Sequence, residues 1–306
     1  MASNAIVWAR RLGTEGLLPA ARARVESAPG YSYFVGSAVF HYLGPAFAVL
    51  LFARVGPLGV AWLRIATAAA VYAAWRRPWR SWRLVDLDGR RTIVAMGFTL
   101  AVMNACFYLA IDRLPLATVA AIEFLPVIAL AALGARTARN GCALAVAVGG
   151  VYLLTDVRLG GGALGFAFAF LNAGLFALYI VLAHRISRLR VMGGIDGLAA
   201  AMLVAVVVVT PIGGWQAAST IVDPVALAAG IGVGVTSSVI PYVCDQLAMQ
   251  KMARSTYALL VALLPATATV VGVIVLTQIP KPLEVLAIAL VVGGVMLHRE
   301  PATARS

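Results

Sequence analysis

The sequence has few charged residues and little of what builds an enzyme centre. Only 12% of its 306 residues are Asp, Glu, Lys or Arg, whereas an ordinary soluble domain has roughly 25%. Its three histidines are scattered, and no HExxH, GxSG or DxxD-like pattern occurs, so an integral membrane enzyme is a remote alternative. The three cysteines lack CxxC or Cys/His spacing and therefore predict neither a disulfide framework nor a metal site. No cofactor is expected.

Apolar residues take the place of the missing charge, at 62% of the chain. A bilayer core needs about 20 apolar residues per helix, and ten such runs can be marked. The predicted spans are 33–53, 57–75, 92–112, 115–135, 141–155, 162–184, 194–213, 228–250, 255–278 and 283–298. The sequence therefore predicts an all-α integral membrane protein, with the bilayer as its solvent.

The charge that is present is mostly positive, with a net charge of +12. A nucleic-acid partner would need a basic face on a soluble module, but the arginines lie in short clusters between apolar runs. One set of loops and tails holds most of them: Arg10, Arg11, Arg22, Arg24, Arg76, Arg77, Arg80, Arg83, Arg90, Arg91, Arg136, Arg139, Arg185, Arg188, Arg190, Lys251, Arg254, Arg299 and Arg305. The other set holds Arg54, Arg113, Arg158 and Lys281.

This asymmetry predicts a multi-pass membrane protein with both termini in the cytoplasm, by the positive-inside rule. The first 30 residues lack an apolar stretch and carry four arginines, so no cleaved signal peptide is expected. The predicted tails are residues 1–32 and 299–306.

Two segments recur in the same order. AVAVGGVYLL at 145–154 returns as ALVVGGVMLH at 289–298, and CFYLAIDRLPLATVA at 106–120 aligns with CDQLAMQKMARSTYA at 244–258. These matches predict a five-helix unit that occurs twice, over 33–155 and 162–298. Because five is odd, the second copy must enter the membrane from the opposite face, which gives an inverted repeat.

Four motifs carry a resemblance to a known family. They are GPLGVAWLRIATAAAVY at 56–72, MNACFYLAIDRLPLATVAAIEFLPVIAL at 103–130, LNAGLFALYIVLAHRIS at 171–187, and SSVIPYVCDQLAMQKMARSTYALLVALLPATA at 237–268. The chain resembles the EamA family of the drug/metabolite transporter superfamily, and within it the threonine/homoserine exporter type.

The resemblance implies a ten-helix carrier of the inner membrane that exports small metabolites, most of all amino acids, by alternating access through a central cavity. The runner-up is an exporter of drugs or other metabolites with an aromatic cavity. A homodimer is left open. Two departures from the exporter type put its substrate range in doubt, because Leu264 and Gln278 stand where that type has glutamates.

Three polar residues inside the predicted spans share one depth. With about 1.5 Å of rise per residue, Arg64, Asn104 and Glu123 all lie roughly 10–12 Å from the outer ends of their helices. Such residues face the bundle interior by default. We therefore predict a buried Arg64–Glu123 ion pair with Asn104 nearby, and the resemblance supports it because the family pattern has an arginine and a glutamate at these two places.

Three roles compete for this pair. It could hold two helices together, or it could bind a substrate, with the guanidinium taking a carboxylate through a bidentate contact and the glutamate taking an ammonium group. A proton carrier is the weakest of the three, because a neighbouring arginine favours the charged carboxylate.

Five further residues are candidates for the cavity lining. His41, Asn172, Tyr108, Tyr179 and Tyr242 could line the cavity, or could serve only packing and interhelical hydrogen bonds.

Gating candidates form a second group. Asp245 could belong to a cytoplasmic gate or pair with Lys251 or Arg254 near the interface. Pro126, Pro241 and Pro265 each free a backbone carbonyl four residues earlier and permit a bend.

The glycine doublets 149–150 and 293–294, with Ala145 and Ala289, predict close packing of the fifth and tenth helices outside the transport path.

Overall fold

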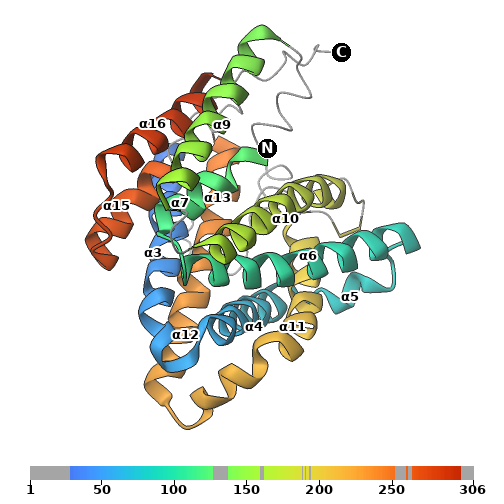
Figure 1. Ribbon diagram of the computed structural model, residues 1–306. Helices are drawn as coiled ribbons and strands as arrows, with labels where there is room; N and C mark the ends of the chain where they lie inside the picture. The colour runs from blue at the N-terminus through green and yellow to red at the C-terminus, as the bar shows by residue number, and fades with distance from the viewer. Residues whose placement is uncertain are drawn as a thin grey trace.

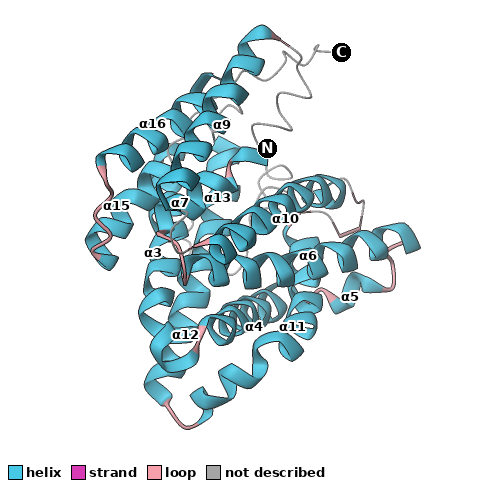
Figure 2. Ribbon diagram, viewed as in Figure 1, coloured by secondary structure: helices cyan, strands magenta, loops and turns pink. Residues whose placement is uncertain are grey.

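The computed structural model describes residues 28–126, 137–158, 162–187, 189, 191–192, 194–251, 260 and 264–297. Regular structure in these ranges is helical throughout, without a strand (Figure 2). The predicted all-α class is therefore confirmed.

The helices follow the predicted spans (Figure 1). They are α3 (Gly30–Val55), α4 (Pro57–Arg76), α5 (Trp79–Trp82), α6 (Leu87–Ile111), α7 (Leu116–Glu123), α9 (Ala138–Arg158), α10 (Ala163–Ser187), α11 (Ile195–Ala217), the 3₁₀ turn η2 (Ala218–Ile221), α12 (Pro224–Gly234), the π-helical turn η3 (Val235–Val239), α13 (Ile240–Lys251), α15 (Leu264–Leu276) and α16 (Pro282–Leu297).

Six helical segments of the described chain are long and apolar enough to cross a membrane, and they lie at Gly30–Val55, Pro57–Arg76, Leu87–Ile111, Ala163–Ile186, Ile195–Ala217 and Pro224–Asp245. Three shorter apolar helices lie at Ala138–Leu153, Leu264–Leu276 and Pro282–Leu297. The number of crossings stays a prediction.

Capping residues set several helix starts earlier than predicted. Asp86 accepts a hydrogen bond from the Gly89 amide at 3.3 Å, so α6 begins at Leu87 and takes in charged residues that look like loop in the sequence. Asp223 likewise accepts from the amides of Val225 and Ala226, at 3.1 and 3.0 Å, and α12 begins at Pro224. Such caps satisfy amides that have no partner in the first turn of a helix.

The span predicted over 115–135 is interrupted. Helix α7 ends at Glu123, and Phe124 follows as a turn residue one position before the helical pair Leu125 and Pro126. Proline has no amide hydrogen to donate to the carbonyl of Ile122, four residues earlier, and this loss weakens the helix at that point. The rest of the predicted span, from 127 on, lies outside the described residues.

Helix packing follows a simple pattern. Three pairs run together: α4 with α11, α7 with α15, and α9 with α16. Helix α3 packs against α12, α13 and α15, whereas α10 packs against α6 and α7 (Figure 1). Apolar side chains form two large clusters, and Arg64 of α4 lies in sequence between Leu63 of one cluster and Ile65 of the other.

Helices α9 and α16 meet through one glycine from each. A Cβ atom on Gly150 would lie 2.6 Å from the Ala287 carbonyl oxygen, and one on Gly294 would lie 2.7 Å from that of Ala143. The predicted close packing is therefore present, but its face is different. Gly149 and Gly293 face open space, and Ala145 and Ala289 are exposed. The helices instead contact each other through the second glycine of each doublet, Gly150 and Gly294.

Candidate functional site

A cavity of ≈ 440 Å³ lies inside the helix bundle. Every helix predicted to surround the transport path contributes to its lining: α3, α4, α6, α7, α10, α11, α13 and α15. The lining residues of the described chain include none from α9 or α16, in agreement with the predicted position of those helices outside the path. We call this space the central cavity.

Arg64 reaches the central cavity from α4 and is held by the turn η3. Its Nε donates to Ser238 Oγ at 2.8 Å, and its Nη2 donates to the Ser237 carbonyl at 3.1 Å. The guanidinium carbon also lies 5.7 Å from the centre of the Tyr108 ring, within cation–π range. Tyr108 was predicted to touch substrate, but the structure places it against Arg64 rather than among the lining residues.

The acceptor for Arg64 exists because of a local irregularity. Pro241 has no amide hydrogen, so the Ser237 carbonyl, four residues earlier, lacks its usual α-helical donor. The intervening π-helical turn widens the backbone, as such turns commonly do at functional sites. Gly44 of α3 lets this turn approach closely, because a Cβ there would collide with Ser237 Oγ. The freed carbonyl that the sequence predicts at Pro241 is thus the one that positions Arg64.

Glu123 lies at the end of α7 on another side of the same cavity. Its Oε1 accepts a hydrogen bond from Asn172 Nδ2 of α10 at 3.1 Å. The carboxylate is 7% exposed, so the amide supports a charge that is almost fully removed from solvent.

The prediction of an ion pair between Arg64 and Glu123 is wrong. Both residues lie in the described chain and line one cavity, yet no ion pair joins them. The physical reason is that each side chain already has neutral partners. The guanidinium donates to one hydroxyl oxygen and one backbone carbonyl, and the carboxyl group accepts from an amide. Asn104 also lines the cavity, but its Nδ2 donates to the Leu100 carbonyl of its own helix at 2.8 Å.

Four buried polar atoms in this region have no hydrogen-bond partner within the described structure: Asn172 Oδ1, Ser237 Oγ, Tyr42 Oη and Tyr108 Oη. Of their residues, Asn172 lines the central cavity and the other three do not. An unpaired buried acceptor is costly unless a ligand or water completes it. The central cavity therefore presents a cation on one wall, and a carboxylate with an adjacent free oxygen on another. This arrangement suits a small molecule with an anionic and a cationic end.

Comparison with known proteins now bears on this site. The model of the EamA-like transporter family matches residues 163–299. The threonine/homoserine exporter RhtA of Salmonella typhimurium is 30% identical over 271 residues, which cover 84% of this chain and 88% of the relative. The exporter of the same name from Escherichia coli K12 is 30% identical over 261 residues, covering 83% and 85%.

The chain belongs to the EamA-like transporter family. It is therefore a multi-pass membrane transporter of the inner membrane. A protein of known crystal structure shares its fold, with a TM-score of 0.56 and 19% identity, over 88% of this chain and 96% of that one. At such low identity the likeness concerns the fold alone.

The remaining predicted residues of this EamA-type transporter fall into two groups. His41, Tyr179, Tyr242 and Asp245 line the central cavity with Arg64 and Glu123. Pro126 and Pro265 are not among the lining residues. Pro265 is the second residue of α15, where its carbonyl accepts from Thr269 Oγ1 at 2.9 Å.

The predicted pairing of Asp245 with Lys251 or Arg254 stays a prediction. Lys251 Nζ donates to the Ala28 carbonyl at 2.7 Å and lies 5.1 Å from the centre of the Tyr33 ring. Arg254 is not among the described residues. Asp245 is a second acidic residue in the lining of the central cavity, besides Glu123. Among the described residues no three His, Cys, Asp or Glu side chains gather closely enough to hold a metal ion.

Sequence reasoning missed the two serines that hold Arg64. A search for charged residues inside apolar spans passes over Ser237 and Ser238, which carry no charge. The available signal was the sequence SSVIPY at 237–242, where a proline follows the serines within one helical turn. Four phenylalanines of the lining were also missed: Phe34, Phe107, Phe124 and Phe176.

Proposed function

We propose that this transporter exports small amino acids of the threonine and homoserine type from the cytoplasm by alternating access. The relatives that match most of the chain are named for these substrates. The observation that carries the proposal is the separation of two opposite charges in one cavity, each held by neutral partners. Paired charges would neutralise each other, whereas separated charges can bind the two ends of a zwitterion. The cavity volume of ≈ 440 Å³ lies within the roughly 300–1,000 Å³ of small-molecule sites.

The contacts of Arg64 define how a carboxylate would approach. Its Nε edge is occupied by the serine contacts, so a substrate carboxylate takes the outer end of the guanidinium, through Nη1 and the second hydrogen of Nη2. The ammonium group faces Glu123 and the unpaired Asn172 Oδ1. The neutral polar side chains of Asn104, Tyr179 and Tyr242 are then available to a substrate hydroxyl.

The packing supports the predicted ten-helix inverted repeat. Let α3, α4, α7 and α9 correspond to α10, α11, α15 and α16, and let α6 correspond to α12 and α13. Exchanging the halves then preserves the most extensive helix contacts. Packing of α3 on α13 and α15 becomes packing of α10 on α6 and α7, and packing of α4 on α12 becomes that of α11 on α6. The three pairs of equivalent helices map onto themselves.

Contacts between helix ends support the predicted orientation, with both termini cytoplasmic. Arg76 Nε contacts Asp196 Oδ1 at 2.6 Å, and Arg139 Nε donates to the Leu297 carbonyl at 2.7 Å. All four ends are predicted to be cytoplasmic. Arg54 and Asp223, predicted to be outside, lie 3.5 Å apart.

Export is tested by expressing the protein in an amino-acid-sensitive bacterial strain and measuring resistance and efflux of threonine, homoserine and other amino acids. Wild type is expected to confer both, whereas Arg64→Ala and Glu123→Ala are expected to lose them. Arg54→Ala is the matched control, because Arg54 is exposed and is not among the residues that line the cavity. Failure of every amino acid to be exported would leave the family intact and remove this function.

A second candidate has one specific observation in its favour. Phe34, Phe107, Phe124 and Phe176 line the central cavity, as an exporter of aromatic or drug-like compounds would require. The same strain distinguishes the two candidates. Resistance to aromatic toxic compounds that survives Arg64→Ala would favour the drug exporter, whereas its absence alongside efflux of amino acids would favour the first proposal.

A further inference from the structure

A basic and aromatic segment links α4 to α6, and neither the transport site nor the helix packing accounts for it. From Trp75 to Arg91 it reads WRRPWRSWRLVDLDGRR, with six arginines and two aspartates. Arg77 has left-handed backbone angles, with φ of 49°, and its amide donates to the Ala73 carbonyl at 2.9 Å, which ends α4. Pro78 then starts the short helix α5, near the start of α6 (Figure 1).

An apolar groove of ≈ 320 Å³ lies between α5 and α11. Trp79 and Trp82 form one side of it, and Ala200, Leu203 and Val207 lie on the other. Its rim is open to the surroundings, since Trp79 is 56% and Val207 71% exposed. On a membrane protein such a surface meets lipid chains, and tryptophans are enriched where chains give way to headgroups. We call this the α5–α11 groove.

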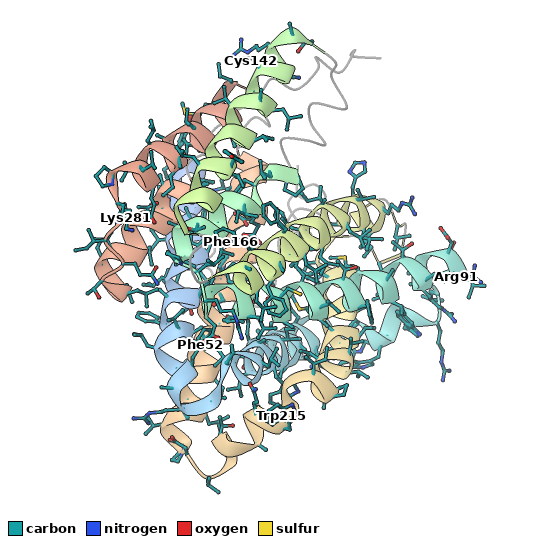
Figure 3. All side chains as sticks on the ribbon, in the orientation of Figure 1. Phe52, Arg91, Cys142, Phe166, Trp215 and Lys281 are labelled. Atoms are coloured by element: carbon teal, nitrogen blue, oxygen red, sulfur yellow. The ribbon has the colours of Figure 1, made fainter. Side chains whose placement is uncertain are left out.

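The segment that supplies Trp79 and Trp82 carries an excess of positive charge. Arg77, Arg80, Arg83 and Arg91 are exposed, and Figure 3 shows Arg91 projecting away from the body of the molecule at the start of α6. Of the two aspartates, Asp86 is occupied as the cap of α6. The ion pair between Arg76 and Asp196 removes one arginine from this excess.

Arg90 connects this charge to the groove. Its guanidinium carbon lies 5.9 Å from the centre of the Trp82 ring, and its Nη2 donates to the Arg83 carbonyl at 3.0 Å. Its Nε is buried and has no acceptor within the described structure. A buried guanidinium donor without an acceptor indicates a missing anionic oxygen.

We propose that the α5–α11 groove and its arginines bind an anionic phospholipid. One acyl chain fills the groove, and the phosphate accepts hydrogen bonds from Arg90 and from Arg80 or Arg83. Basic side chains beside membrane helices attract anionic headgroups in this way, and the long arginine stems reach the headgroup level from the apolar boundary.

A second groove on the transporter serves as an internal comparison for lipid binding. A second apolar groove, of ≈ 470 Å³, lies between α3 and α12 and includes Phe47, Leu50 and Val225. The basic residue in its lining, Arg54, contacts Asp223 at 3.5 Å. A lipid there gains an apolar surface but little net positive charge. Selectivity for anionic headgroups is therefore a property of the α5–α11 groove.

The test is native mass spectrometry of the purified transporter in detergent with phosphatidylglycerol or phosphatidylethanolamine of identical acyl chains. Wild type is expected to bind phosphatidylglycerol about tenfold more tightly. The combined variant Arg80→Gln, Arg83→Gln, Arg90→Gln is expected to lose this preference, and Arg54→Gln to keep it. Val207→Trp narrows the groove, leaves the arginines in place, and is expected to weaken binding of both lipids.

Three results would overturn the proposal. They are equal binding of both lipids by wild type, a preference for phosphatidylglycerol that survives in the triple variant, and full displacement of lipid by inorganic phosphate, which would assign the arginines to a soluble anion. Thermal unfolding of each variant shows whether it is folded, and Val207→Trp provides an independent test if the triple variant is not. The readout is lipid binding, so the result does not depend on amino-acid export.

Discussion

The two predicted repeats of the chain contribute different chemistry to the central cavity. The first half supplies both charges of the proposed substrate site, Arg64 on α4 and Glu123 on α7. The second half supplies their neutral partners, Ser237 and Ser238 on η3 and Asn172 on α10. The site is therefore asymmetric, and each charge of one predicted repeat is held by neutral groups of the other.

This difference has a consequence for transport. When two halves of a carrier move against each other, contacts that cross the boundary are the ones that change. The hydrogen bonds of Arg64 and Glu123 both join one predicted repeat to the other. In the proposed alternating access, movement of the repeats would change whether each side chain binds the protein or the substrate. Polar residues at such positions are costly in lipid and are retained for function.

Removing the cation should have the largest effect. Arg64→Ala deletes the proposed carboxylate contact and leaves the Ser237 carbonyl without its donor. Charge-assisted hydrogen bonds contribute about 1.5–3 kcal/mol, so substrate affinity should fall about tenfold to hundredfold. Uptake of labelled threonine into inside-out membrane vesicles measures it, with Arg54→Ala as control. A variant that transports normally would remove Arg64 from the site.

Neutralising the anion should have the next largest effect. Glu123→Gln keeps the shape and can still accept from Asn172, but it loses the attraction for an ammonium group, and affinity should fall about tenfold. Transport by Glu123→Gln across a pH series tests the proton-carrier role. A pH dependence that is unchanged from wild type would exclude that role.

The pair α9 and α16 provides a prediction for the scaffold. Gly150→Ala places a Cβ against the Ala287 backbone, and such overpacking costs about 1–3 kcal/mol of unfolding free energy. Gly149→Ala is the matched control, because its Cβ meets open space, and there the better helix propensity of alanine should raise stability by up to about 1 kcal/mol. Thermal unfolding in detergent measures both. Equal shifts for the two variants would contradict the assigned contact face.

The two asparagines of the cavity should differ, with a smaller effect overall. Asn172→Leu removes the donor to Glu123 and the free acceptor, so affinity should fall about threefold to tenfold, as for a typical hydrogen bond. Asn104→Leu removes a bond to its own helix and one of three neutral side chains available to the substrate hydroxyl, but no contact of the ammonium group, and should change affinity less. Comparing the apparent KM of both variants in vesicles tests this order. The reverse order would move the ammonium site from Asn172 towards Asn104.

Much of the fold could be predicted because its signal is long and local. Apolar runs locate the helices, and the charge of the loops predicts on which side of the membrane each loop lies. The charges of the site could also be found, since Arg64 and Glu123 stand out inside apolar runs. Their partners could not, because depth places residues on a level but does not say which helix faces which.

Three particular residues show this limit. Ser238 and Asn172 became partners of the charges through helix contacts between segments more than 40 residues apart in the chain. Gly150 packs on α16 whereas its neighbour Gly149 faces outward, a choice that depends on helix rotation. Rotation and partner choice are tertiary properties, and a run of apolar residues that is hydrophobic all round does not encode them locally.

The central claim is that Arg64 and Glu123 bind opposite ends of one substrate instead of each other. It is tested by measuring binding of threonine, threonine methyl ester and N-acetylthreonine to wild type, Arg64→Ala and Glu123→Gln by calorimetry. Wild type should prefer threonine to both analogues. Arg64→Ala should lose the preference over the ester alone, and Glu123→Gln the preference over the N-acetyl compound alone. Equal weakening of all three compounds in both variants would contradict the claim and assign the two charges to structure.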